Sequence, residues 1–278
     1  MAGLSIGNPP TELALARWQP PAGCRHIEFF SDVHLKADEP RTAQALAAYL
    51  SHSDADAIVV LGDLFEAWVG DDARHEGFDA HWLALLSVAA RQRPMALMVG
   101  NRDFLLGDAF LHDAGIAPLP DATVAEAFGQ RILLSHGDAW CLDDREYLAF
   151  RRRVRDAAWQ AAFLATPLAE RRATAARMRA ASESRKHDAG FEGYADVDAD
   201  AARAGLRAAG ASVLLHGHTH RPGTQDLGAG LARWVLSDWS FDGAGPPRGD
   251  VLRWDRSGLS RWLVGADGRL TAATTASA

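Results

Sequence analysis

Polar side chains that bind metal ions follow five short apolar runs in this sequence of 278 residues. The runs end at Phe30, Leu61, Val99, Leu134 and Leu215. In open α/β sheets, ligands bind beyond the carboxyl ends of the strands, so these clusters should meet at one edge. The side chains that offer oxygen or imidazole nitrogen there are Asp32, His34, Asp63, Asn101, His136, His218 and His220.

This set of donors indicates a pair of divalent cations. Oxygen and imidazole nitrogen without thiolate suit Mn²⁺, Fe²⁺, Ni²⁺ or Zn²⁺ better than copper(I) or iron–sulfur clusters. Asp32 and His34 are two residues apart and therefore point the same way on an extended segment, and His218 and His220 repeat this spacing. Seven ligands exceed the need of one ion. Two cations about 3.5–4 Å apart form the usual clamp for in-line attack on phosphorus.

The predicted strands and helices that position these residues indicate a layered α/β domain. Short apolar runs alternate with longer segments of helical periodicity, which is typical of this class. We expect strands at 26–30, 57–61, 95–99, 131–134 and 212–215, a closing hairpin at 251–254 and 260–264, and helices at 41–51 and 78–91.

Composition excludes several other classes of protein. The chain is 48% hydrophobic and 23% charged, which excludes a disordered chain, and its net charge is −7. We expect no nucleic-acid partner. It contains no apolar run of 18 residues, and residues 1–22 do not resemble a secretory signal. Two cysteines, Cys24 and Cys141, fit a reducing compartment. We expect a loose arm at 1–22 and a loose tail at 265–278.

Charge is distributed unevenly along the chain. The window from Arg145 to His187 holds eleven basic and four acidic residues, so it carries +7 and the remainder −14. Apolar residues from Tyr147 to Phe163 follow helical spacing, and Thr166-Pro167 should end this helix and begin a second one. We therefore expect a basic, amphipathic helical pair that forms a lid over an anionic amphiphile. A solvated helix face packed on the main domain is the alternative.

The order of the motifs resembles that of the calcineurin-like metallophosphoesterases. Longer strings resemble the UDP-2,3-diacylglucosamine hydrolase family of lipid A biosynthesis: GDLFEAWVGDD from Gly62, GNRDFLLG from Gly100 and HGHTHRP from His216. The resemblance covers about residues 26–264. It implies a layered β-sandwich flanked by helices at 23–264, with a helical lid inserted at about 145–200.

The resemblance also implies roles for individual residues. Asp32, His34, Asp63 and His220 match the ligands of one Mn²⁺ ion; Asp63, Asn101, His136 and His218 match those of a second, with Asp63 bridging. Arg102 occupies the position where many superfamily members have a histidine. An arginine stays charged and can donate two hydrogen bonds to a phosphate. Expected catalytic residues are Asp63, Asn101, Arg102 and His136; expected substrate contacts are Asn101, Arg102, Asp144, Ser182, Lys186 and His218. The chain departs from the family at Ala189, where a lysine is usual.

The implied reaction is hydrolysis of UDP-2,3-diacylglucosamine to UMP and 2,3-diacylglucosamine 1-phosphate. The resemblance places such an enzyme in the cytoplasm, peripherally attached to the inner leaflet of the inner membrane. A different dimetal phosphoesterase, acting on nucleotides or phosphoproteins, is the first alternative; turnover of soluble nucleotides but not of the acylated substrate would favour it. A metal-free binding module is the second, although such proteins typically lose ligands and all seven are present here.

Overall fold

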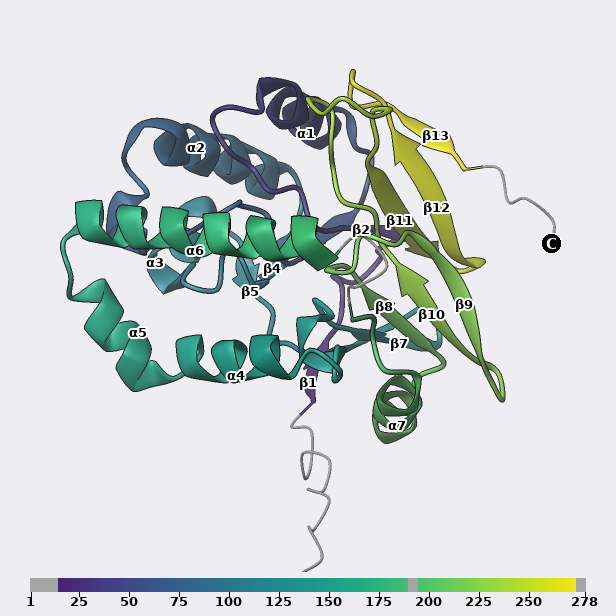
Figure 1. Cartoon of the computed structure of the whole chain (residues 1–278). Coiled ribbons are helices and arrows are strands. Elements are labelled where there is room, and N and C mark those ends of the chain that lie inside the picture. Colours follow the sequence, from purple (N-terminus) through teal and green to yellow (C-terminus); the bar gives the residue numbers. More distant parts are fainter. Residues whose placement is uncertain (1–14, 190–194, 274–278) are drawn as a thin grey trace, which may run out of the picture.

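Two β-sheets packed face to face form the centre of the protein, and helices cover their outer faces (Figure 1). The structure is a computed structural model that describes residues 15–189 and 195–273, with backbone alone at 181–189. The larger sheet contains, in spatial order, β13 (Leu270–Ala272), β12 (Gly258–Val264), β11 (Asp250–Asp255), β2 (His26–Phe30), β3 (Ala57–Leu61), β4 (Met95–Met98) and β5 (Ala117–Pro118). The smaller contains β1 (Ala16–Trp18), β6 (Thr123–Ala127), β7 (Gln130–Leu134), β8 (Val213–His216), β10 (Leu231–Val235) and β9 (Gly223–Gly228).

The polar clusters follow parallel strands in both sheets. Strands β2, β3 and β4 pair in parallel, as do β7 and β8. All five residues of β3 are buried, because a parallel strand in the middle of a covered sheet meets apolar neighbours on both faces. The closing hairpin forms as expected from β11 and β12, which extends the larger sheet by antiparallel pairing.

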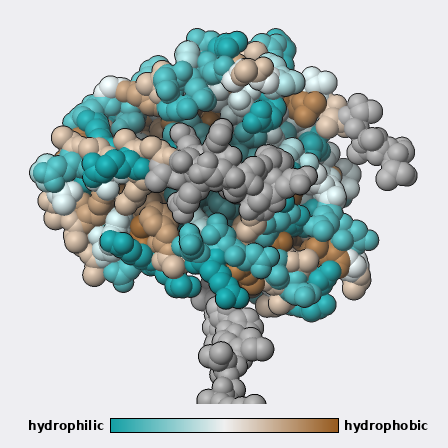
Figure 2. Space-filling view, viewed as in Figure 1, coloured by the Kyte–Doolittle hydropathy of each residue, from teal (hydrophilic) through white to brown (hydrophobic). Residues whose placement is uncertain are grey.

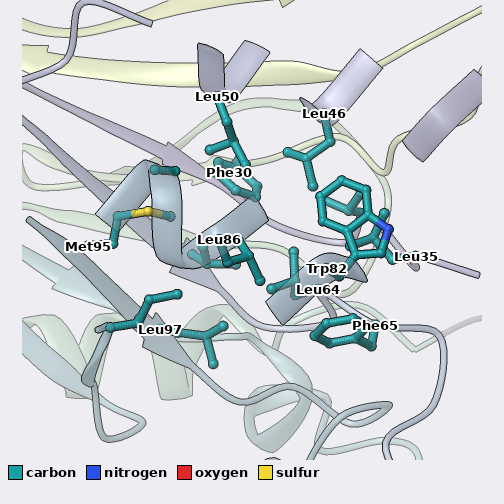
Figure 3. Close-up of a cluster of buried hydrophobic side chains, with 14 of the residues drawn as sticks. Phe30, Leu35, Leu46, Leu50, Leu64, Phe65, Trp82, Leu86, Met95 and Leu97 are labelled. Carbon is teal, nitrogen blue, oxygen red and sulfur yellow. The ribbon is translucent and has the colours of Figure 1, made fainter. Parts of the chain in front are cut away.

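Three apolar layers hold the two sheets and the helices together. Between the larger sheet and α1 (Pro40–His52), α2 (Gly77–Gln92) and α3 (Asp108–Ala114), Phe30, Leu46 and Trp82 are fully or almost fully buried (Figure 3). A second layer fills the space between the sheets, and a third packs α7 (Ala199–Ala209) against the smaller sheet. This arrangement confirms the α/β class and the helix-flanked sandwich.

Both expected loose ends contain a short strand. In the segment assigned to the arm, β1 pairs in parallel with β6. In the segment assigned to the tail, β13 pairs with the edge strand β12. Pairing with an open sheet edge satisfies the backbone N–H and C=O groups of these two segments. Composition alone does not reveal this pairing, because the partner strand is distant in sequence. Residues 1–14 and 274–278 lie outside the described part of the chain.

The basic window forms three helices, which we call the helical insertion: α4 (Arg145–Val154), α5 (Ala157–Leu164) and α6 (Leu168–Ala189). The prediction of one continuous helix from Tyr147 to Phe163 was wrong. Asp156 interrupts it, because its carboxylate accepts a hydrogen bond from the backbone N–H of Trp159 and begins a new helix. The Thr166 hydroxyl donates back to the carbonyl of Phe163, and Pro167 directly precedes α6.

Buried polar contacts attach the helical insertion to the main domain. Arg171 of α6 is 2% exposed and donates to the carbonyl of Val69 and to both carboxylate oxygens of Asp72. Arg155 donates to the carbonyl of Gly100 at 2.8 Å, next to an expected metal ligand. These contacts place the insertion beside the edge where the polar clusters meet (Figure 1). No helix within residues 15–189 and 195–273 is long and apolar enough to cross a bilayer.

Candidate metal centre

The seven expected metal ligands come together at the carboxyl ends of the strands. Five of them have left-handed backbone conformations, with φ between 52° and 64°, which residues other than glycine rarely adopt. Such strain persists where the surrounding structure enforces it, and it clusters at functional sites. The residues concerned are Asp32, His34, Asp63, His218 and His220.

The first ligand group consists of Asp32, His34 and His220, whose donor atoms lie within 4.8 Å of one another. The Nε2 atoms of the two imidazoles are 3.3 Å apart, and Nε2 of His220 is 3.4 Å from Oδ1 of Asp32. Two imidazole nitrogens and a buried carboxylate therefore face one point, as the ligands of a divalent cation do.

The second ligand group surrounds the side-chain oxygen of Asn101. Nε2 of His136 lies 2.9 Å from this oxygen and Nδ1 of His218 lies 2.8 Å from it. The other ring nitrogen of His136, Nδ1, lies 2.9 Å from the carbonyl oxygen of Leu61 and donates to it when it carries the proton. Such a bond leaves the lone pair of Nε2 available to bind a cation.

Asp63 lies between the two groups. Its Oδ2 is 3.9 Å from Nε2 of His34, and its Oδ1 is 3.6 Å from Nε2 of His136. The backbone N–H of Arg102 donates to Oδ1 at 2.8 Å and holds the carboxylate in this orientation. Asp63 therefore faces both groups of expected ligands.

The electrostatics of the centre favour added positive charge. Burial raises the pKa of Asp63 to about 7, and the carboxylates of Asp103 and Asp32 contribute to this rise. Burial also opposes ionisation of Asp32, but the imidazoles of His220, His136 and His34 together outweigh it and hold the pKa of Asp32 well below its usual value. Burial alone would lower the pKa of His136, yet Asp63 and Asp32 raise it to about 9. Several carboxylates are thus buried together, an arrangement that a divalent cation neutralises.

Two motif glycines allow the backbone to approach the central carboxylates. A Cβ atom on Gly100 would collide with Oδ1 of Asp63, and one on Gly217 would collide with Oδ2 of Asp32. Each glycine immediately precedes a ligand, Asn101 or His218. Glycine is therefore required at these positions by close packing.

Glu66 and Asp103 support the centre without being among the expected site residues. Oε2 of Glu66 lies 3.1 Å from Nδ1 of His34, so this carboxylate lies beside an expected metal ligand. Asp103 accepts hydrogen bonds from the backbone N–H groups of Leu64 and Gly100, which ties together the loops after β3 and β4. Both residues lie in the quoted motifs, but spacing alone does not show which group each one contacts.

The expected substrate contacts lie at different distances from the centre. The guanidinium of Arg102 lies beside Asp63, and its buried Nε has no acceptor among the described residues. Asp144 is exposed at the start of α4, where it accepts from the backbone N–H of Tyr147. The side chains of Ser182 and Lys186 lie outside the described residues, as does that of Ala189.

An apolar cleft of about 310 Å³ opens beside Asn101 and Arg102 and is called the apolar lobe. Brown surface between α6 and the pair α4–α5 marks this region in Figure 2. The rings of Trp159 and Phe163 stack here at 5.0 Å. Its large apolar side chains are Trp68, Phe104, Phe150, Trp159, Phe163 and Met178. An apolar cavity next to a polar, anionic centre suits an amphiphile.

The donor set fits divalent cations, since carboxylate, amide and imidazole groups converge on two adjacent points and Asp63 lies between them. The composition of the site therefore agrees with a metal-dependent phosphoesterase.

Comparison with known proteins identifies the family. The family model for calcineurin-like phosphoesterases matches residues 26–222. A protein from Chromobacterium violaceum named UDP-2,3-diacylglucosamine hydrolase is 48% identical over 243 residues, covering 86% of this chain and 99% of its own length. A protein of the same name from Xanthomonas axonopodis pv. citri is 42% identical, covering 84% of this chain and 96% of its own. The structure of wild-type Vps29 from Entamoeba histolytica is 15% identical, with a TM-score of 0.43 over 89% of this chain and 97% of that one. The chain therefore belongs to the calcineurin-like phosphoesterases and, among them, to the UDP-2,3-diacylglucosamine hydrolase family.

Proposed function

We propose that this protein hydrolyses the diphosphate of UDP-2,3-diacylglucosamine, releasing UMP and 2,3-diacylglucosamine 1-phosphate for lipid A biosynthesis. The observation that carries the proposal is the apolar lobe, which opens directly beside Asn101 and Arg102 of the metal centre. This substrate has acyl chains at one end and a diphosphate in the middle, so it matches an apolar cavity joined to a centre that would bind divalent cations. The name shared by the relatives supports the same substrate.

Each expected site residue has a task in this reaction. Asp32, His34, Asp63 and His220 would hold one cation, and Asp63, Asn101, His136 and His218 the other. Bound cations would supply positive charge that polarises the phosphorus–oxygen bonds and activates water. We assign Arg102, whose guanidinium lies beside Asp63, to a two-pronged hydrogen bond with the phosphate that leaves with the sugar. We assign Asn101 and His218 to orienting the same phosphate, and Asp144, Ser182 and Lys186 to contacts with the sugar phosphate.

We propose Mn²⁺ as the metal, two ions per chain, on the strength of the oxygen and nitrogen donors and the resemblance. Protein stripped of metal should release no UMP from UDP-2,3-diacylglucosamine, and added Mn²⁺ should restore the reaction. Mass spectrometry of both products tests reaction, metal and substrate together. If Mn²⁺ restores only the cleavage of a generic phosphodiester, the metal centre stands and the substrate is different. If Mn²⁺ neither binds nor restores any hydrolysis, the chain is a binding module.

We further propose that the helical insertion rests on an anionic membrane surface, where the acylated substrate resides. Apolar side chains are exposed on or next to the insertion, namely Leu142 at 43%, Phe150 at 36%, Leu164 at 41% and Met178 at 38%. Exposed arginines Arg152 and Arg153 lie on α4. Each basic residue near an anionic surface contributes about 1 kcal/mol.

Vesicle sedimentation tests this membrane contact. We expect binding to phosphatidylglycerol vesicles at low salt, weaker binding at high salt, and little binding to neutral phosphatidylcholine vesicles. The variant Arg152→Glu with Arg153→Glu should bind several-fold less. Equal sedimentation of the variant and the unaltered protein would contradict the proposal.

A further inference from the structure

The cleft at the metal centre has a second lobe of opposite character. This polar lobe has a volume of about 160 Å³ and adjoins the apolar lobe, with which it shares two lining residues. Lys36, Glu39 and Ser240 contribute an ammonium, a carboxylate and a hydroxyl group to its wall. Only Arg102 and Arg179 line both lobes among the described residues.

The metal centre lies at the boundary between the lobes. His34 and His220 of the first ligand group line the polar lobe, whereas Asn101 of the second group lines the apolar lobe. Two guanidinium groups, those of Arg102 and Arg179, therefore lie where the lobes join; Arg102 is beside Asp63 and Arg179 is paired with Glu66. Guanidinium groups and divalent cations together are the usual partners of adjacent phosphates.

We propose that the polar lobe binds the nucleoside monophosphate half of the substrate, with Lys36 and Glu39 as its specificity-determining contacts. This inference rests on the proposed function, because it divides the same substrate between two lobes. The acyl chains occupy the apolar lobe, the diphosphate crosses the boundary, and the nucleoside extends into the polar lobe.

The chemistry of the polar lobe suits a ribose and a pyrimidine base. The ammonium of Lys36 lies 2.8 Å from the Glu39 carboxylate, and both side chains are about one-third exposed. A donor beside an acceptor matches the ring carbonyl and N–H of uracil and the hydroxyl groups of ribose. Lys36 and Glu39 lie between β2 and α1, and Ser240 lies between β10 and β11, so these groups belong to the main domain. The nucleotide contacts thus come from the main domain, whereas the main domain and the helical insertion together form the apolar lobe.

The experiment measures how each product inhibits Mn²⁺-loaded protein. For Lys36→Met and for Glu39→Gln, we expect the inhibition constant of UMP to rise about tenfold, as for the loss of one hydrogen bond to a charged group. The KM for UDP-2,3-diacylglucosamine should rise by a similar factor, with kcat changed less than threefold. Inhibition by 2,3-diacylglucosamine 1-phosphate should not change.

Two control variants make the result specific. Asp38→Asn changes an exposed carboxylate between Lys36 and Glu39 and should leave both inhibition constants unchanged. Phe150→Ala, in the apolar lobe, should weaken inhibition by the lipid product and leave UMP inhibition unchanged. Binding of UMP measured by saturation-transfer NMR supplies a readout that does not depend on turnover.

The outcomes separate this inference from the proposed function. Normal hydrolysis of UDP-2,3-diacylglucosamine, with UMP inhibiting the Lys36 and Glu39 variants as strongly as the unaltered protein, overturns the nucleotide lobe and leaves the function intact. Absence of any hydrolysis of that substrate by Mn²⁺-loaded protein overturns the function, and the inference with it. A selective loss of UMP affinity in both variants supports the inference.

Discussion

Replacement of Asp63 by asparagine is expected to lower kcat/KM for UDP-2,3-diacylglucosamine by about 10³-fold, which corresponds to about 4 kcal/mol of transition-state stabilisation. The carboxylate lies 3.9 Å from Nε2 of His34 and 3.6 Å from Nε2 of His136, between both ligand groups. An amide keeps the shape of the side chain but offers one neutral oxygen in place of two anionic ones. Steady-state kinetics at saturating Mn²⁺ measure the loss.

Thermal unfolding shows whether Asp63→Asn loses activity because the metal centre is changed or because the protein no longer folds. The pKa of Asp63 is raised to about 7 by burial, above its ordinary value of 3.8, so ionisation of this group at pH 8 opposes folding in the metal-free protein. Metal-free Asp63→Asn protein should therefore melt at or above the temperature of the unaltered protein at pH 8. Added Mn²⁺ should raise the melting temperature of the unaltered protein more than that of the variant.

Asp267→Asn is a matched control, because Asp267 is exposed in the turn between β12 and β13. It should change neither turnover nor the effect of Mn²⁺ on melting. Turnover of Asp63→Asn at the level of this control would contradict the bridging role of Asp63.

Replacement of Phe163 by glutamate is expected to lower kcat/KM for the acylated substrate by about 10²-fold. Phe163 stacks on Trp159 in the apolar lobe, where the acyl chains would lie. A charge at this position keeps acyl methylenes in contact with water, and each methylene left unburied costs about 0.8 kcal/mol. Loss of three or four such contacts accounts for the expected factor.

The same variant should cleave a small generic phosphodiester at nearly the original rate, because such a substrate needs the metal centre and not the apolar lobe. The fold should tolerate the change, since no residue of α5 is fully buried. Phe163→Leu keeps the apolar surface and should lose less than fivefold on the acylated substrate. Equal losses of Phe163→Glu on both substrates would mean that α5 supports the metal centre and does not bind acyl chains.

The Asp63 and Phe163 variants test two parts of the site, the metal centre and the apolar lobe, which come from distant segments of the chain. Asp63 follows β3 of the main domain, whereas Phe163 belongs to the helical insertion, and both contribute to one cleft. A defect on every phosphodiester therefore points to the metal centre, and a defect confined to acylated substrate points to the insertion.

Much of this arrangement is determined by the sequence alone. Each short apolar run became a strand because β-branched and large apolar side chains fill a buried pleated surface, as in Ala57–Leu61. The polar clusters directly after these runs were predicted to meet, since parallel strands carry their carboxyl ends to a common edge. The spacing of two residues within Asp32–His34 and within His218–His220 predicts these pairs of expected ligands from the sequence.

Other features were decided only by tertiary structure. The pairs Asp32 with His34 and His218 with His220 converge through left-handed backbone conformations and not through the extended segment that spacing suggested. The strand pairing of β1 and β13 and the contact of Glu66 with His34 depend on neighbours that short-range patterns do not specify. The division of the cleft into an apolar and a polar lobe has the same origin. A cavity is bounded by side chains from segments far apart in the chain, and their juxtaposition exists only once the sheets and the helical insertion have packed.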